Sequence, residues 1–486
     1  MIRLYILALA LVAGPLAPAR AQDNDWFKAG AARIAELAAR APIKTRAKNV
    51  ILFIGDGMDI TTITAARIYD GQQKGESGEE NRLSFDRFPY SALVKTYNVD
   101  AQTPDSAGTA TAILSGVKTS MGVIGVDQTV KRGDCAAMAG HKVTSFLERA
   151  ASAGRATGVV TTTRLTHATP AATYAHVPDR HWESDGQLPA EAKKQGCRDI
   201  ASQFVAATGI TVAFGGGRAK FLPRSMADPE YGAKGVTGKR RDGRNLIAEW
   251  RARPGSVYVW NKRQFDALAP RPGQRVLGLF EPSHMHFEAD RAGDEAGEPS
   301  LADMTAKAIA LLAANPAGFF LMVEGGRIDH AHHAGNAARA LGDTVAFADA
   351  VAAAVEATDE RDTLIIVTAD HGHTLSLAGY ARRGAPILGL ADMAKNGKGR
   401  KAKDGKPYTI LGYANGPGAP KGRRPDISQT EAMALDYHQQ ALVPLGSETH
   451  GGQDVAAFAR GPRAYLLGGV IEQNVLFHLM QYASGL

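Results

Sequence analysis

Cysteine and long apolar runs are scarce in this chain, and each scarcity excludes a class of protein. Only Cys135 and Cys197 are present among 486 residues, too far apart for a Cys-x-x-Cys metal knuckle. The sequence has no Gly-x-Ser-x-Gly elbow and no phosphate-binding Walker loop, which argues against an α/β-hydrolase triad and a nucleotide cradle. The net charge of +7 is mild. It suits an anionic substrate without requiring nucleic acid.

The N-terminus has the pattern of a secretory signal peptide over residues 1–21. Arg3 precedes the apolar run Leu4–Val12, and Ala19-Arg20-Ala21 provides a small-x-small cleavage site. The alternative is a buried N-terminal helix. The run is too short to span a bilayer, and the C-terminus shows no lipid-anchor pattern. We therefore expect a periplasmic or secreted protein without a membrane anchor, beginning near Gln22.

The two cysteines are interpreted in the light of that compartment. An oxidising environment favours one disulfide between Cys135 and Cys197. Two unrelated free thiols are the alternative.

Four apolar, β-branched runs predict buried strands at Asn49–Ile54, Ala156–Thr163, Gly318–Val323 and Thr363–Thr368. Ala-rich stretches with helical character lie between them, for example Ala337–Val355. This alternation predicts an α/β fold, a three-layer α/β/α sandwich around a mostly parallel sheet. We expect a single domain over residues 22–486.

Two further segments differ from this pattern. Residues 381–440 are rich in Gly, Pro, Lys and Arg and hold one strand-like piece, Tyr408–Tyr413, which predicts an insertion in the sheet domain. Its basic run Lys395–Lys406 is typical of a solvated loop. Asp23–Ala41 has the spacing of an amphipathic helix. Such a helix packs on a partner subunit or on its own core, and the sequence leaves both open.

Polar chemistry follows all four predicted strands. Asp56 lies between two glycines after the first strand, and Glu324 follows the third. The other two strands lead to Arg164, His167 and Thr169, and to Asp370-His371. Because ligands bind at the carboxyl ends of parallel strands, we expect these side chains to form one site.

Acids and histidines are densest at Val323–His333. Asp329 and His333 stand four residues apart, so a helical turn places both on one face, and His330 lies between them. Such groups are costly to bury without a neutralising partner, and Asp with His is a common ligand set for zinc. His450, in a late Gly-rich segment, is a weaker candidate ligand.

Ser106 is the candidate nucleophile. The Ala-rich stretch after it predicts a helix, which places Ser106 at an N-terminus, where the backbone favours an anion. A serine at such a position is commonly only an N-cap.

These stretches together resemble the alkaline phosphatase family, most closely its animal-type branch. The resemblance rests on Thr103–Ala112, Val159–Asp185, Val323–His333, Thr368–His371 and Glu448–Gly452. It implies a phosphate monoester hydrolase that acts through a phosphoserine. It also implies two zinc ions and one magnesium ion.

The resemblance assigns a role to each site residue. Asp329, His333 and His450 would hold the first zinc, while Asp370 and His371 would hold the second. Asp56 would bridge the second zinc to magnesium, whose other protein ligands would be Thr169 and Glu324. Ser106 would be the nucleophile, Arg180 the phosphate clamp and Asp105 its support. His167 and His330 would lie behind the ligands.

Three further features follow from the same resemblance. A fourth ion site, suited to calcium, would use Glu230, Glu281, Glu298 and the carbonyl of Phe280. Residues 381–440 fall where the family has its crown domain. The N-terminal helix resembles an arm that embraces a second subunit, which implies a homodimer.

Two alternatives remain at this point. One is a phosphodiesterase or sulfatase-like hydrolase on the same fold. The other is a non-catalytic protein of the cell envelope that binds metal or phosphate.

Overall fold

The computed structural model describes residues 24–393 and 399–486, which form two compact units divided after Pro42. The predicted signal peptide, residues 1–21, lies outside the described residues. In the first unit, helix α1 (Asp25–Ala38) is capped by Asn24, whose side chain accepts a hydrogen bond from the Trp26 amide. Trp26, Phe27 and Ile34 on this helix are all more than half exposed.

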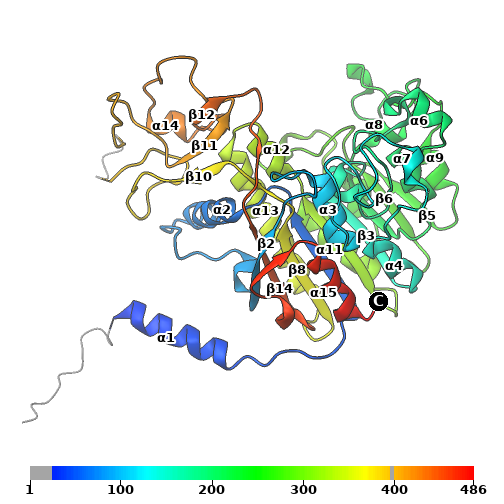
Figure 1. Cartoon of the computed structure of the whole chain (residues 1–486), viewed down its shortest axis with the longest axis horizontal. Helices are drawn as coiled ribbons and strands as arrows, with labels where there is room; N and C mark the ends of the chain where they lie inside the picture. The colour runs from blue at the N-terminus through cyan, green and yellow to red at the C-terminus, as the bar shows by residue number, and fades with distance from the viewer. Residues whose placement is uncertain (1–23, 394–398) are drawn as a thin grey trace, which may run out of the picture. The chain divides into compact units, whose positions relative to one another are not determined.

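The second unit is built on a ten-stranded sheet in the order β15-β2-β14-β8-β1-β7-β3-β4-β6-β5 (Figure 1). At its centre lie the four predicted strands, β8 (Thr363–Ala369), β1 (Asn49–Gly55), β7 (Phe319–Gly325) and β3 (Ala156–Arg164), all mutually parallel. Every residue of β1, β7 and β8 is buried. Continuous burial explains their unbroken apolar runs.

Six strands of this sheet were not predicted from the sequence. They are β2 (Tyr90–Lys95), β4 (Val212–Gly216), β5 (Ser256–Val259), β6 (Arg275–Leu279), β14 (Val455–Arg460) and β15 (Val470–Glu472). They extend the central four on both sides, and β14 runs antiparallel to β2 and β8. The sheet is therefore mostly parallel, as predicted.

Helices cover the sheet in two separate groups (Figure 1). Helices α2 (Ile60–Gln73), α11 (Leu301–Leu312) and α13 (Ala337–Glu356) pack together, and α3 (Ser106–Ser115), α4 (Phe146–Ser152) and α15 (Val475–Ser484) form the other group. Phe347 of α13 meets Phe53 of β1 edge to face. Phe146 of α4 packs between Phe320 of β7 and Phe477 of α15. Burying each such ring contributes roughly 1.5–3 kcal/mol.

Shorter helices lie in the connections. They are α5 (Ala168–Ala171), α6 (Ala190–Lys194), α7 (Ile200–Ala206), α8 (Arg218–Phe221), α9 (Leu246–Arg251), α10 (Lys262–Asp266), α12 (Arg327–His333) and α14 (Gln429–Ala432). Among the described residues, no helix combines the length and apolar character needed to cross a membrane.

Two small sheets stand apart from the central one. Strands β10 (Leu375–Leu377), β11 (Leu411–Gly416) and β12 (Ala441–Pro444) form one. The strand-like piece predicted at Tyr408–Tyr413 thus begins and ends three residues later than predicted. The other sheet pairs β9 (Gly372–His373) with β13 (His450–Gly451), which sets His373 opposite His450.

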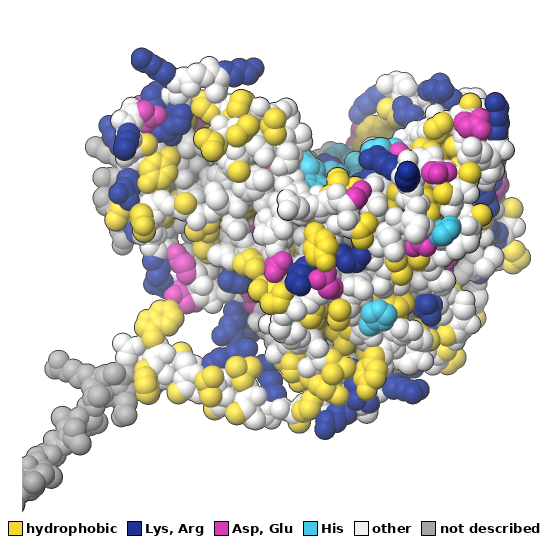
Figure 2. All heavy atoms as spheres, viewed as in Figure 1, with side chains coloured by type: hydrophobic (Ala, Val, Ile, Leu, Met, Phe, Trp, Pro, Cys, Tyr) yellow, Lys and Arg dark blue, Asp and Glu magenta, His cyan; other side chains and the backbone are white. Residues whose placement is uncertain are grey.

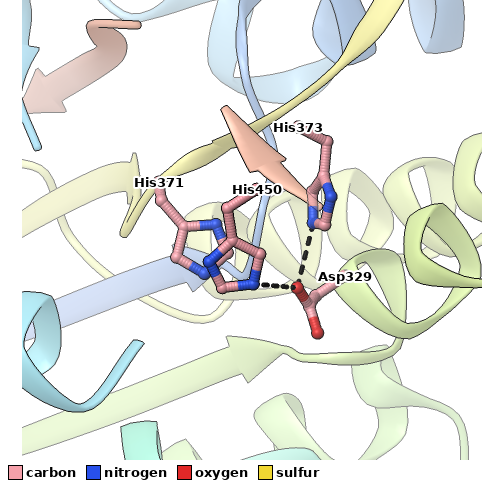
Figure 3. Close-up of side chains that lie close together, drawn as sticks. All are labelled: Asp329, His371, His373 and His450. Atoms are coloured by element: carbon pink, nitrogen blue, oxygen red, sulfur yellow. Dashed lines mark hydrogen bonds and ion pairs between the residues drawn. The ribbon is translucent and has the colours of Figure 1, made fainter. Parts of the chain in front are cut away.

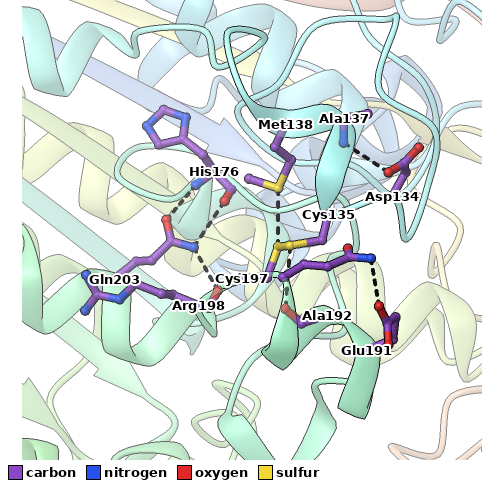
Figure 4. Close-up of a disulfide and its surroundings, with 11 residues drawn as sticks. Asp134, Cys135, Ala137, Met138, His176, Glu191, Ala192, Cys197, Arg198 and Gln203 are labelled. Carbon is purple, nitrogen blue, oxygen red and sulfur yellow. Dashed lines mark hydrogen bonds between the residues drawn. A yellow bond between two sulfur atoms is a disulfide. The ribbon is translucent and has the colours of Figure 1, made fainter.

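A disulfide joins Cys135 to Cys197 (Figure 4). The described residues contain no free cysteine, so the alternative of two unrelated thiols is wrong. The bridge closes a loop of the chain that contains His167, Thr169 and Arg180.

Removing this bridge should destabilise the protein. Cys135→Ala combined with Cys197→Ala is expected to lower the free energy of unfolding by about 2–4 kcal/mol, because the unfolded chain regains the entropy that the closed loop removes. Denaturant unfolding measures the change. In the denatured, unreduced parent protein, thiol titration should find no free thiol; two titratable thiols would contradict the prediction.

Candidate metal centre

The ends of the central strands place their acids and histidines around one point. The register aligns Ile54 with Glu324 and Thr368, so Asp56, Glu324 and Asp370 leave neighbouring strands at the same edge. Gly57 makes the turn after Asp56 possible. Its φ is +71°, and a Cβ there would lie 2.4 Å from the His373 ring. Its amide donates to Asp370 Oδ1 at 3.0 Å, which ties β1 to β8 at the site.

The first ligand group consists of Asp329, His333 and His450. Asp329 Oδ1 lies 3.3 Å from His333 Nε2 and 3.4 Å from His450 Nε2, and the two nitrogens are 3.1 Å apart. Each Nδ1 faces a backbone carbonyl, that of Glu448 for His333 and that of Pro104 for His450. Carbonyls only accept, so both Nδ1 atoms carry a proton, and both Nε2 atoms face the carboxylate. Although burial opposes it, the charge of Asp329 raises the pKa of His333. A cation held by the three side chains would replace a proton at Nε2.

The second group contains Asp56, Asp370 and His371. His371 Nε2 lies 3.3 Å from Asp56 Oδ1 and 3.5 Å from Asp370 Oδ2. All three side chains are fully buried. Yet neither oxygen of Asp56, nor Oδ2 of Asp370, has a hydrogen-bond partner. Buried carboxylate oxygens without partners are expensive, and a metal is the ligand that fits them.

The third group is mostly oxygen. Asp56 reappears here, together with Thr169 Oγ1 and Glu324 Oε1, both buried without a hydrogen-bond partner. The second oxygen of Glu324 is held by the hydroxyls of Thr161 and Thr163. His167 also lies within metal-binding reach of Asp56 and Glu324, and its Nδ1 is buried without a partner. The oxygen atoms suit magnesium, and the imidazoles of the first two groups suit zinc.

The protein itself does not neutralise the buried carboxylates of these groups. Burial, followed by the charges of Asp370 and Asp329, raises the pKa of Asp56 well above its usual range. Burial raises the pKa of Glu324 to about 7 and that of Asp370 to about 6. It also lowers the pKa of His371 well below its usual value, so the imidazole is neutral and able to bind a metal.

Ser106 begins α3, with Asp105 as its N-cap. Ser106 Oγ is 3.2 Å from His371 Nε2, beside the second ligand group. One oxygen of Asp105 accepts from the amides of Gly108 and Gly122, and the other accepts from Arg180 Nη1 at 2.9 Å. The guanidinium is thereby fixed next to the helix N-terminus, a position that favours an anion.

His167 and His330 lie behind the ligands. His167 Nε2 is 3.2 Å from Arg180 Nη2, and its ring is 5.5 Å from that of His330. Arg327 Nη1 approaches His330 Nδ1 at 3.0 Å. Burial holds the pKa of His167 well below its usual value and that of His330 at about 3. Both rings are neutral supports.

Two important residues were missed by sequence reasoning, His373 and Glu448. His373 Nε2 contacts Asp329 Oδ1 at 2.9 Å (Figure 3). Its Nδ1 contacts Glu448 Oε2 at 2.6 Å. Burial opposes charge on His373, but its bonds to both carboxylates outweigh burial and raise its pKa to about 10. One sequence signal could have identified His373. It lies two residues after His371, which places a second histidine near the same strand end.

Around the expected fourth site Glu281 and Glu298 converge with His286, while Glu230 Oε2 forms an ion pair with Arg218 Nη2 at 2.9 Å. Glu281 and Glu298 lie within metal-binding reach of each other, and Oε1 of Glu230 and Oε2 of Glu298 are buried without hydrogen-bond partners. Two features differ from a simple oxygen cage. The Phe280 carbonyl accepts from Arg218 Nη1 at 3.0 Å, and His286 Nδ1 lies 3.5 Å from Glu298.

Comparison with known proteins decides the family. The alkaline phosphatase family model matches residues 47–486. The chain belongs to the alkaline phosphatase family. It is 47% identical to the tissue-nonspecific alkaline phosphatase of Gallus gallus, across 99% of this chain and 93% of that protein. It is 46% identical to an alkaline phosphatase of Gadus morhua, across 95% and 96%.

Solved alkaline phosphatases share the fold. The Thermus thermophilus enzyme superimposes with a TM-score of 0.65 at 25% identity, over 92% of this chain and 93% of that chain. The predicted α/β class and family are therefore confirmed. The chain is a phosphate monoester hydrolase of a metal-dependent family.

Replacing His373, which lies within metal-binding reach of Asp329, His371 and His450, should weaken metal binding. In His373→Ala, Asp329 loses its 2.9 Å contact and Glu448 loses its partner, so metal affinity is expected to fall about 10–100-fold. Competition against a chelator measures the change. His438→Ala, at an exposed position, is the control. Equal affinities in the two variants would contradict the role given to His373.

Proposed function

We propose that this alkaline phosphatase transfers the phosphoryl group of a monoester to Ser106 and then to water, with two zinc ions and one magnesium ion in the three ligand groups. The observation that carries the proposal is the position of Ser106 Oγ. It lies 3.2 Å from His371 Nε2, at a helix N-terminus beside a fixed guanidinium. No other serine in the described residues has this combination of neighbours.

The chain's own residues bind and orient the substrate. Arg180 presents its guanidinium to two phosphate oxygens, which only a fork of parallel donors can engage together. Asp105 holds that fork from behind and also caps α3, so the clamp and the nucleophile share one support. Attack by Ser106 oxygen forms its bond to phosphorus as the bond to the leaving alcohol breaks. Water then attacks the phosphoserine and releases inorganic phosphate.

The bound cations would supply the positive charge that favours a deprotonated serine oxygen and neutralises charge on the departing one. Asp329, His333 and His450 would hold the first zinc. Asp370 and His371 would hold the second, and Asp56 would bridge it to magnesium at Thr169 and Glu324. The buried, unpartnered oxygens of Asp56, Thr169, Glu324 and Asp370 support this assignment.

Ser106→Ala should abolish turnover while the protein stays folded and metal-loaded. We expect p-nitrophenyl phosphate hydrolysis to fall by a factor of about 10³ or more, since the nucleophile is removed and only the electrostatic part of the site remains. Steady-state kinetics, with metal analysis of the same sample, measures both properties.

Ser115→Ala, at the opposite end of the same helix, is the matched control and should retain activity. Near-normal hydrolysis by Ser106→Ala would rule out the phosphoserine. A higher kcat/KM for diesters than for monoesters would instead favour the diesterase alternative. Absence of turnover in fully metallated parent protein would favour the non-catalytic one.

We further propose that the mature chain starts near Gln22, is exported to the periplasm or secreted, and forms a homodimer through α1. The exposed Trp26, Phe27 and Ile34 support the dimer, because large apolar side chains gathered on one helix mark an interaction surface. Residues 381–440 would form the crown-like insertion. Calcium would occupy the fourth site at Glu230, Glu281 and Glu298.

Loss of α1 should weaken the dimer. A chain that lacks residues 22–42 is expected to dissociate at protein concentrations where the parent remains dimeric, since the apolar face of α1 is gone. Sedimentation velocity over a dilution series measures this. Trp26→Ser combined with Ile34→Ser should shift the equilibrium in the same direction. An unchanged sedimentation profile in both would argue against the arm.

A further inference from the structure

A second polar cavity lies outside the metal centre. Its volume is about 580 Å³, within the range of about 300–1,000 Å³ that is usual for small-molecule sites. Five cationic side chains line it, and Glu183 is the only carboxylate in its lining. The cations are Arg164, Lys220, Arg224, Lys239 and Arg241.

Glu183 is already neutralised. It accepts from Arg164 Nε at 2.6 Å and from Arg164 Nη2 at 2.9 Å, and Lys220 Nζ lies 3.3 Å away. The hydroxyl of Thr166 donates to it as well, at 2.6 Å. This carboxylate therefore has no capacity left for the remaining cations of the cavity.

The remaining cations lack such a partner. Arg224, Lys239 and Arg241 are exposed, and within the part of the chain that the structure describes they form no ion pair with an acidic side chain. Lys220 is largely buried, and burial lowers the pKa of its ammonium group. Like charges gathered in a concave site repel one another and concentrate anions from solution. A multiply charged anion would complement these charges.

Side-chain contacts connect the cavity to the catalytic centre. Arg164, at the end of β3, contacts His284 through Nη1, and the His284 ring lies 5.4 Å from that of His167. His167 in turn contacts Arg180. A run of direct contacts thus links the cavity to the phosphate clamp. The space-filling view shows histidines together with basic side chains in the hollow of the face it draws (Figure 2).

We propose that this cavity binds a condensed phosphate, a di- or triphosphate group. Its phosphate groups carry several adjacent negative charges, which match the several unpaired cations. Proteins commonly bind phosphate oxygens through arginine guanidinium and lysine ammonium groups. A single carboxylate would leave most of the cations unpaired. The condensed phosphate is either a free ligand or a part of the substrate. In the second case the terminal phosphate of the same substrate reaches Ser106.

Binding tests the site without any turnover. The metal-loaded, full-length Ser106→Ala protein is dialysed against radiolabelled inorganic tripolyphosphate with excess Mg²⁺, while inorganic phosphate fills the catalytic centre. Adding Arg224→Ser, Lys239→Ser and Arg241→Ser should weaken binding at least about tenfold, because three charge-assisted contacts are lost. The control carries Arg271→Ser, Lys421→Ser and Arg423→Ser, which are exposed positions with the same charges. It should bind as Ser106→Ala alone does.

Two results would overturn the proposal: no saturable binding to Ser106→Ala, or equal binding by the cavity and control variants. Neither result depends on phosphatase activity, so this experiment tests the binding site independently of the proposed function. Kinetics with Ser106 intact then identifies the source. If the cavity variant loses kcat/KM for ATP but not for p-nitrophenyl phosphate, the condensed phosphate belongs to the substrate. If binding is lost and both values are unchanged, it is a free ligand.

Discussion

Repulsion among buried carboxylates is the constraint on which this structure depends. Asp56, Glu324, Asp329 and Asp370 approach one another inside the protein, and three of them hold oxygens without hydrogen-bond partners. The metal-free arrangement is costly, because each charge loses water and gains like-charged neighbours. The parallel sheet holds them there, since its strands are pinned by fully apolar burial. Rigidity of the core thus maintains an arrangement that is favourable only with cations bound.

The residues behind the ligands explain how the centre keeps its geometry. The Nδ1 atoms of His333 and His450 bind backbone carbonyls, which fixes both tautomers. His373 connects Asp329 to Glu448, and His332 stacks on His373 while its Nδ1 lies 2.8 Å from Tyr413 Oη. Tyr413 belongs to β11, so the small outer sheet is joined to the metal centre by side-chain contacts.

Much of the fold and of the candidate site could be predicted from sequence for a physical reason. Strands buried on both faces have continuous apolar sequences, so β1, β3, β7 and β8 could be predicted. The polar residues that follow them indicated one edge of the sheet. The strands β2 and β15 lack such runs, because partial exposure mixes polar residues into them. The strand β14 is short, rich in alanine and partly exposed at every second residue, so its run carries little β-branched signal. Contacts of His373 and Glu448 depend on the pairing of β9 with β13, which no local pattern encodes. The basic cavity likewise forms from three distant segments.

The separation of the ligands along the chain has a consequence for biogenesis. Asp56 lies near the start of the folded unit and His450 near its end, with the other ligands spread between them. A nascent polypeptide that ends before His450 lacks a proposed ligand of the first group and the partner strand of β9. Under this assignment, cation capture would follow synthesis of nearly the whole chain, and a truncated product would lack the complete centre.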